Sequence, residues 1–94
     1  MAGYILAQLK ITDRRLHERY REALLPLVDR MGGRLRIDGE VDVLEGDRMT
    51  GRVMLIEFQS RDAARLFYGS PEYEQIRSLR DQATDGSLWL LDGT

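Results

Sequence analysis

The sequence is poor in the residues that build common metal and redox sites. It contains no cysteine, which excludes disulfide bonds and thiolate metal ligands. Its one histidine, His17, excludes metal sites built from histidine clusters, and no cofactor is expected. A glycine-rich phosphate loop and a serine–histidine–aspartate pattern are also missing. Any reaction would therefore depend on ordinary polar side chains.

Charge and hydropathy argue against two classes of partner. The 14 basic and 16 acidic residues are mixed along the chain and give a net charge of −2, so we expect no nucleic acid binding. No apolar run approaches the roughly 20 residues that a membrane span needs. Residues 1–10 contain a short apolar run without a basic segment before it. They predict a strand, not a signal peptide, and a cytoplasmic location.

The length of 94 residues predicts one domain over residues 1–94. A hydrophobic fraction of 43% is typical of globular proteins. A chain of this size buries only a modest share of its surface. In the absence of disulfides, we expect a partner subunit to supply additional stability.

The first part of the chain predicts a strand followed by a helix. Residues 4–11 alternate between an apolar face and a half-apolar face, which is typical of a strand with one buried side. Thr12 or Asp13 can cap the helix that follows, because their side-chain oxygens accept the free first-turn amides. The apolar stripe of this helix comprises Leu16, Tyr20, Leu24, Leu27, Val28 and Met31.

Pro26 falls inside this helical pattern. Proline within a helix removes a hydrogen bond, so the sequence predicts a kink near Ala23 or a break there. Gly32 and Gly33 predict the end of the helix, since a left-handed cap favours residues without Cβ.

Residues 34–44 keep a strand period for eleven residues. Gly39 falls in the inward phase, which predicts a bulge or a close backbone approach there. Turn residues at 45–47 and 50–51 connect this run to residues 52–58 as a hairpin. The predicted inward face comprises Leu35, Ile37, Gly39, Val41 and Val43.

Residues 52–58 and 88–91 are apolar in both phases, which is typical of strands buried on both sides. Between them, Ser60 and Ser70 are placed to cap two short helices. Residues 85–86, Asp-Gly, predict a turn into the last strand.

The resulting element order is β-α-β-β-α-β with the second helix split. This order predicts an α+β, ferredoxin-like fold with a four-stranded antiparallel sheet and the helices on one face. The two-sided strands would leave apolar side chains on the uncovered face, which monomers seldom tolerate. We therefore expect a homodimer packed sheet to sheet.

Several short patterns resemble those of a known family. They are Thr12-Asp13, Gly-Gly-Arg at 32–34, Val-Leu-Glu-Gly at 43–46, I-E-F-x-S-x-x-A-A-x-x-F-Y-x-S-P-E-Y at 56–73, Arg77, Arg80 and Asp85-Gly86. Together they resemble the small bacterial family of domain of unknown function 1330, over almost the whole chain. The resemblance implies a dimeric α+β barrel. That group includes cofactor-free quinone-forming monooxygenases, muconolactone isomerases and haem-binding chlorite dismutases. The family itself has no settled activity.

Two residues are candidates for moving protons. Glu57 lies on a strand that is apolar on both faces, so we expect it to be partly buried and to need a partner. It either pairs with an arginine such as Arg80, Arg77 or Arg34, or acts on a substrate as a base. His17 is either a boundary residue of the first helix or a general base facing a pocket.

Four further residues are candidates for binding a ligand: Tyr20, Tyr68, Tyr73 and Arg80. The tyrosines are either core residues whose hydroxyls reach the rim, or they line a gap between helices and sheet. Arg80 either forms a salt bridge or captures an anion. Its candidate ionic partners are Asp81, Glu74 and Glu57.

Two functions are compatible with these residues. The first is a small dimeric module that is non-catalytic or binds a small ligand, and this is the interpretation that we favour. The alternative is a cofactor-free enzyme, similar to a monooxygenase or isomerase, that acts on a small aromatic or apolar substrate. The volume of a pocket separates them, because ligand sites typically exceed about 300 Å³.

Overall fold

The computed structural model describes residues 1–47 and 51–94. Seven elements follow one another along the chain. They are β1 (Gly3–Ile11), α1 (Arg14–Arg30), β2 (Arg34–Glu40), β3 (Arg52–Phe58), α2 (Arg61–Tyr68), α3 (Pro71–Ala83) and β4 (Thr84–Asp92). In this part of the chain no helix combines the length and the hydropathy needed to cross a bilayer.

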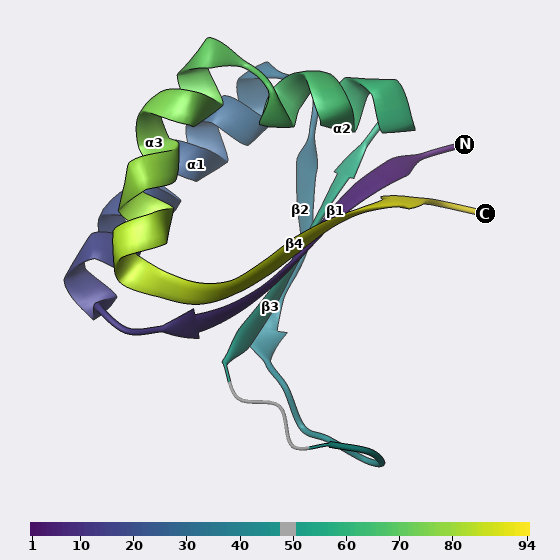
Figure 1. The fold of residues 1–94 in the computed structure, drawn as a ribbon. Helices are drawn as coiled ribbons and strands as arrows, with labels where there is room; N and C mark the ends of the chain where they lie inside the picture. Colours follow the sequence, from purple (N-terminus) through teal and green to yellow (C-terminus); the bar gives the residue numbers. More distant parts are fainter. Residues whose placement is uncertain (48–50) are drawn as a thin grey trace.

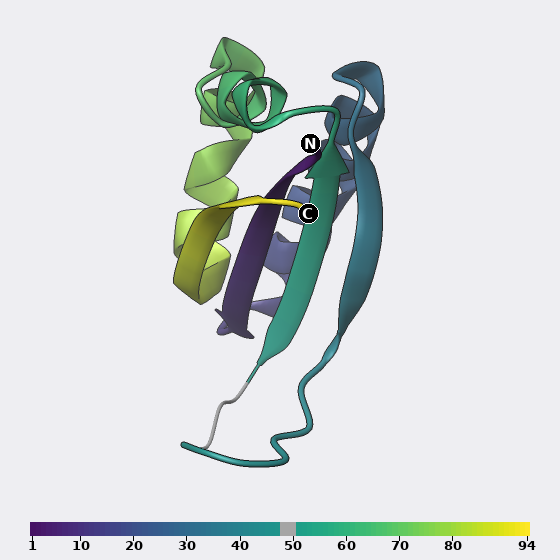
Figure 2. The same ribbon diagram turned by 90° about the vertical axis from the view of Figure 1, so that its right-hand side faces the viewer.

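The four strands form one antiparallel sheet in the order β2-β3-β1-β4. Figure 2 shows this order, with β2 and β4 at the two edges. The helices lie on one side of the sheet, where α1 and α3 pack against each other (Figure 1). This is the predicted α+β, ferredoxin-like fold, so the prediction is confirmed.

The core lies between the helices and one face of the sheet. Strand β1 alternates between buried and half-buried residues, as its sequence period requires. Its neighbour β3 buries the same face and leaves the other face half-buried. The residues that are at most 2% exposed include Leu9, Leu24, Phe58, Phe67 and Tyr73.

Helix α1 begins at the predicted place and runs without a break. The Asp13 carboxylate accepts a hydrogen bond from the Leu16 amide at 3.1 Å, so Asp13 is the cap. The helix continues through Pro26 to Arg30, so the predicted break is wrong. Leu24 and Leu27 flank the proline and are 2% and 3% exposed. Their burial against the core holds the helix together across the proline.

The hairpin of β2 and β3 is confirmed, but the register within β2 differs from the prediction. Leu35 pairs with Ile56, whereas Ile37 pairs with Leu55, so Arg36 is an extra residue in a bulge. A bulge exchanges the two faces of a strand. Ile37 and Gly39 therefore lie on the face away from the helices, and the prediction for them is wrong.

The same bulge turns Asp38 toward the helices, opposite the core residue Met54. A Cβ added at Gly39 would meet nothing within 4 Å, so no close approach requires a glycine there. Strand β2 ends at Glu40, and residues 41–44 contain no strand. Residue 50 of the predicted turn lies outside the described residues.

The two predicted serine caps are confirmed. The Ser60 hydroxyl accepts from the Ala63 amide, and the Ser70 hydroxyl accepts from the Tyr73 amide, both at 3.1 Å. The predicted turn at 85–86 is wrong, because α3 joins β4 directly at Thr84. Gly86 is a strand residue instead. A Cβ there would collide with the carbonyl of Gln8, so close packing against β1 explains the glycine.

The other face of the sheet carries a row of apolar side chains. Ile37, Leu55, Leu6 and Trp89 are successive cross-strand partners in β2, β3, β1 and β4. Ile37 and Trp89 are 49% and 46% exposed in the single chain. We call this row the open-face row. It supports the expectation that a partner covers this face.

Candidate functional site

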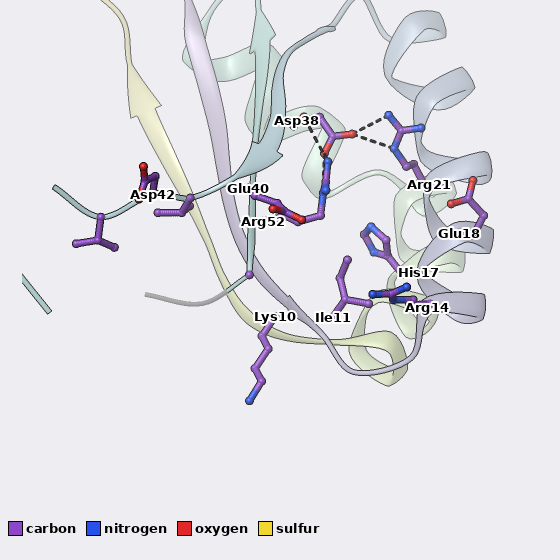
Figure 3. Close-up of a pocket in the computed structure, with 13 residues that line it drawn as sticks. Lys10, Ile11, Arg14, His17, Glu18, Arg21, Asp38, Glu40, Asp42 and Arg52 are labelled. Atoms are coloured by element: carbon purple, nitrogen blue, oxygen red, sulfur yellow. Dashed lines mark hydrogen bonds and ion pairs between the residues drawn. The ribbon is translucent and has the colours of Figure 1, made fainter. Parts of the chain in front are cut away.

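A cleft of about 950 Å³ lies between α1 and the ends of β2 and β3. Figure 3 shows the side chains that line it. Helix α1 contributes Arg14, His17, Glu18 and Arg21. The sheet side contributes Lys10, Ile11, Asp38, Glu40, Gly51 and Arg52. Val41, Asp42 and Val43, just after β2, complete the rim. The volume lies within the range of small-molecule sites.

Asp38 joins three elements at one end of the cleft. One carboxylate oxygen accepts hydrogen bonds from Nε and Nη2 of Arg21, at 3.0 and 2.7 Å. The other accepts from Nε and Nη2 of Arg52, at 3.3 and 3.1 Å (Figure 3). Burial alone would raise the pKa of Asp38, but the hydrogen bonds from both guanidinium groups outweigh it and hold the pKa below its usual value.

His17 is buried in the helix wall of the cleft, with only 7% of its surface exposed. Its Nδ1 is buried and has no hydrogen-bond partner among the described residues. Burial lowers the pKa of the imidazole, so His17 is neutral near pH 7. The structure therefore places a neutral imidazole beside a cavity, where it can donate or accept one proton.

The cleft is polar but electrically balanced. The residues that line it include four basic ones, Lys10, Arg14, Arg21 and Arg52, and four acidic ones, Glu18, Asp38, Glu40 and Asp42. Within residues 1–47 and 51–94, no cluster of three or more histidine, aspartate or glutamate side chains has the arrangement to hold a metal ion.

The candidate tyrosines lie away from this cleft. The hydroxyls of Tyr20 and Tyr73 are 3.0 Å apart and buried, and burial raises the pKa of both. Tyr68 packs on Tyr73 with ring centroids 5.4 Å apart and carries the Arg77 guanidinium 5.6 Å above its ring. Tyr68 also lines a second cavity of about 260 Å³ beside β4. That volume is slightly below the usual size of a ligand site.

Arg80 is nearly buried on α3, with 12% of its side chain exposed. One of its terminal nitrogens bonds to Asp81 at 3.1 Å, which is one of the three predicted ionic partners. Its Nε is buried and has no partner among the described residues.

Glu57 lies on the open face of the sheet and not in the cleft. Its carboxylate accepts a hydrogen bond of 3.0 Å from the Tyr4 hydroxyl and an ion pair of 2.6 Å from Arg36. Arg36 and then Tyr4 lower the pKa of Glu57. The arginine partner is thus the bulged residue and not one of the three predicted arginines. Glu57 is partly buried, as expected, with 26% of its side chain exposed.

The predicted site residues therefore divide among three places. His17 faces the cleft, the tyrosines and Arg80 lie among α1, α2 and α3, and Glu57 lies beyond the sheet. Sequence reasoning missed Asp38 and Arg52, because an unbroken strand period puts Asp38 on the other face. Arg21 could have been found, since it lies one helical turn after His17.

The sequence matches the family described as Domain of unknown function (DUF1330) over residues 2–94. The chain belongs to this family. No curated protein matches it by sequence. The family match agrees with the resemblance seen in the sequence patterns, and the family description assigns no activity.

Solved structures share the fold. RPA0582, a protein of unknown function from Rhodopseudomonas palustris, is 21% identical with a TM-score of 0.79, covering 99% of this chain and 82% of that one. A dimeric ferredoxin-like protein of unknown function from Thermobifida fusca is 14% identical, with a TM-score of 0.68 and coverage of 99% and 92%. SnoaB from Streptomyces nogalater, described as a cofactor-independent oxygenase, is 12% identical, with a TM-score of 0.73 and coverage of 99% and 93%. At these identities the likeness establishes the fold of this DUF1330 member.

Proposed function

We propose that the protein is a cytoplasmic homodimer that binds a small organic molecule in the cleft of each protomer. The cleft of about 950 Å³, with the buried His17 in its wall, is the observation that carries this proposal. Such a volume is well above the roughly 300 Å³ at which ligand sites begin. A polar side chain in the wall of such a cavity is suited to fix the orientation of a bound ligand.

The homodimer is supported by the open-face row and by structural relatives that are described as dimeric. A second copy would cover the apolar side chains that the helices leave uncovered. The cleft lies on the helix side of the sheet, so sheet-to-sheet packing would leave it accessible.

Binding is tested by identifying what the protein carries. We expect mass spectrometry of denatured, freshly purified protein to detect a small molecule in wild type. We expect Val41→Trp, which fills the cleft from its rim, to lose that molecule. Leu44→Trp is the matched control, because Leu44 is three residues away, 93% exposed and not part of the lining. Equal retention by Val41→Trp would contradict binding in the cleft.

A cofactor-free enzyme is the second candidate, and one observation favours it. His17 is neutral and faces a cavity, on a fold shared with a cofactor-independent oxygenase, and in the tautomer that carries its proton on Nδ1 it could accept a proton from a substrate through Nε2. Glu57 lies outside the cleft, so this proposal depends on His17 alone. With small phenols as substrates, His17→Gln should lower any oxygen consumption by about a hundredfold or more. Equal rates in both proteins would remove the proton-transfer role.

A further inference from the structure

At the end of the cleft where Asp38 lies, the groups that remain free to bind a ligand are hydrogen-bond donors. Each oxygen of Asp38 already accepts two hydrogen bonds, so this carboxylate has no remaining capacity for a ligand. Arg21 and Arg52 each use Nε and Nη2 on Asp38 or its backbone carbonyl. Their Nη1 groups have no partner among the described residues. A ligand at this end must therefore supply acceptors.

The tautomer of His17 makes this side chain a further hydrogen-bond donor. Its Nδ1 is buried without a partner among the described residues, and a buried N–H without an acceptor is rarer than a buried lone pair. The single proton of the neutral ring therefore sits on Nε2. Nε2 has no protein partner in residues 1–47 and 51–94, and it belongs to a side chain that lines the cleft. It is available to donate to a ligand.

Arg14 lies one helical turn before His17 on the same wall of α1 (Figure 3). Unlike Arg21 and Arg52, it has no carboxylate partner among the described residues. A guanidinium group offers paired N–H donors that match the two oxygens of a carboxylate. Ile11, Val41 and Val43 supply apolar surface on the floor and rim of the same cleft.

Building on the proposed function, we propose that the cleft binds a small organic monocarboxylate. Arg14 and His17 hold the carboxylate, and the carbon skeleton lies against Ile11, Val41 and Val43. A phosphate or dicarboxylate is disfavoured. Arg14 balances one negative charge, whereas a second charge on the ligand would be repelled by Glu18, Glu40 and Asp42 in the same lining.

The proposal is tested by NMR titration of the full chain with three acids, hexanoate, benzoate and phenylacetate, each paired with its neutral amide. The backbone resonances of Ile11, His17 and Val41 report binding in the cleft. We expect at least one acid to shift them with an affinity at least tenfold higher than that of its amide. Arg14→Gln should lower that affinity at least tenfold and leave amide binding unchanged.

Arg15→Gln is the matched control, because Arg15 is the next residue on α1, is exposed and does not line the cleft. It should change neither affinity. Equal binding of acid and amide, tighter binding of inorganic phosphate, or unchanged binding in Arg14→Gln would each overturn the carboxylate assignment. If none of the six probes binds, but wild type carries a small molecule that Val41→Trp lacks, only the carboxylate assignment is wrong. If Val41→Trp also carries that molecule after purification, the proposed function is wrong as well.

Discussion

His17 occupies a position that an apolar residue would normally take. It lies three residues before Tyr20 and seven before Leu24, which is the spacing of the buried stripe of α1. Its ring lies 6.3 Å from that of Tyr20. An apolar stripe that begins at Leu16 does not include position 17. A stripe that begins at His17 and continues through Tyr20 and Leu24 predicts that the histidine is buried.

His17 makes the stability of the protein depend on pH. Burial lowers the folded-state pKa below the ordinary value of 6.5, so the unfolded chain binds the proton more readily. Stability is therefore complete above about pH 6.5 and decreases as the pH falls through the folded-state pKa. The charged groups around the ring are Arg14, Glu18 and Arg21 on α1, Asp38 on β2 and Arg52 on β3.

Urea unfolding at pH 7.5 and pH 5.5 measures this effect. Wild type should lose more unfolding free energy between these pH values than His17→Gln, which lacks the imidazole. Because the chain has no other histidine, the difference between the two proteins isolates this side chain. Equal losses would show that His17 is not desolvated in the folded state.

The buried contact between the Tyr20 and Tyr73 hydroxyls predicts coupled effects on stability. Tyr20→Phe should cost about 1–3 kcal/mol, because it leaves the Tyr73 hydroxyl buried without its partner. The double change to phenylalanine should cost less than the sum of the two single changes, by about 0.5 kcal/mol or more. Tyr68→Phe is the control, since Tyr68 is 37% exposed and its hydroxyl has no partner among the described residues. Additive costs in the double-mutant cycle would contradict the contact.

At the scale of elements, local patterns predicted the helices, their caps and the order of the strands. They failed where an irregularity depends on tertiary contacts. The bulge at Arg36 leaves the alternation of residues 34–40 intact in the sequence, yet it exchanges the faces of β2. The placement of Asp38 beside Arg21 and Arg52, and with it the cleft, could not follow from periodicity alone.

Asp38 should stabilise the junction of α1, β2 and β3. Asp38→Asn removes charged acceptors from two guanidinium groups, and we expect a loss of about 1.5–3 kcal/mol in urea unfolding at pH 7. The folded-state pKa of Asp38 lies below 3.8, so its contribution persists above about pH 4 and is lost as the pH falls further. Wild type and variant should converge in stability at the lowest pH.

Asp42→Asn serves as the matched control, because Asp42 is an exposed acid on the rim of the same cleft with no ionic partner among the described residues. It should change stability by less than about 0.5 kcal/mol. A similar effect of both changes would indicate a general charge effect instead of a specific junction.

At the scale of the whole molecule, the two faces of the sheet have different roles. The helix side buries the core and forms the cleft, whereas the open-face row presents apolar side chains from all four strands. Glu57, Tyr4 and Arg36 form a hydrogen-bonded polar group on that same face. An apolar row beside a satisfied polar group is typical of an interface between subunits.

The homodimer is tested by light scattering coupled to size-exclusion chromatography at micromolar concentration. The mass measured for wild type should be twice the chain mass of 10.9 kDa.

Leu55→Lys places a charge at the centre of the open-face row, where a second copy would bury it without a partner. We expect a loss of about 3 kcal/mol or more in dimerisation, a rise in Kd of at least a hundredfold and a monomer at the same concentration. Leu66→Lys makes the same change on α2, where Leu66 is 70% exposed and away from the sheet, and should remain dimeric. A monomeric wild type, or dimers that persist in Leu55→Lys, would show that the open face is not the interface.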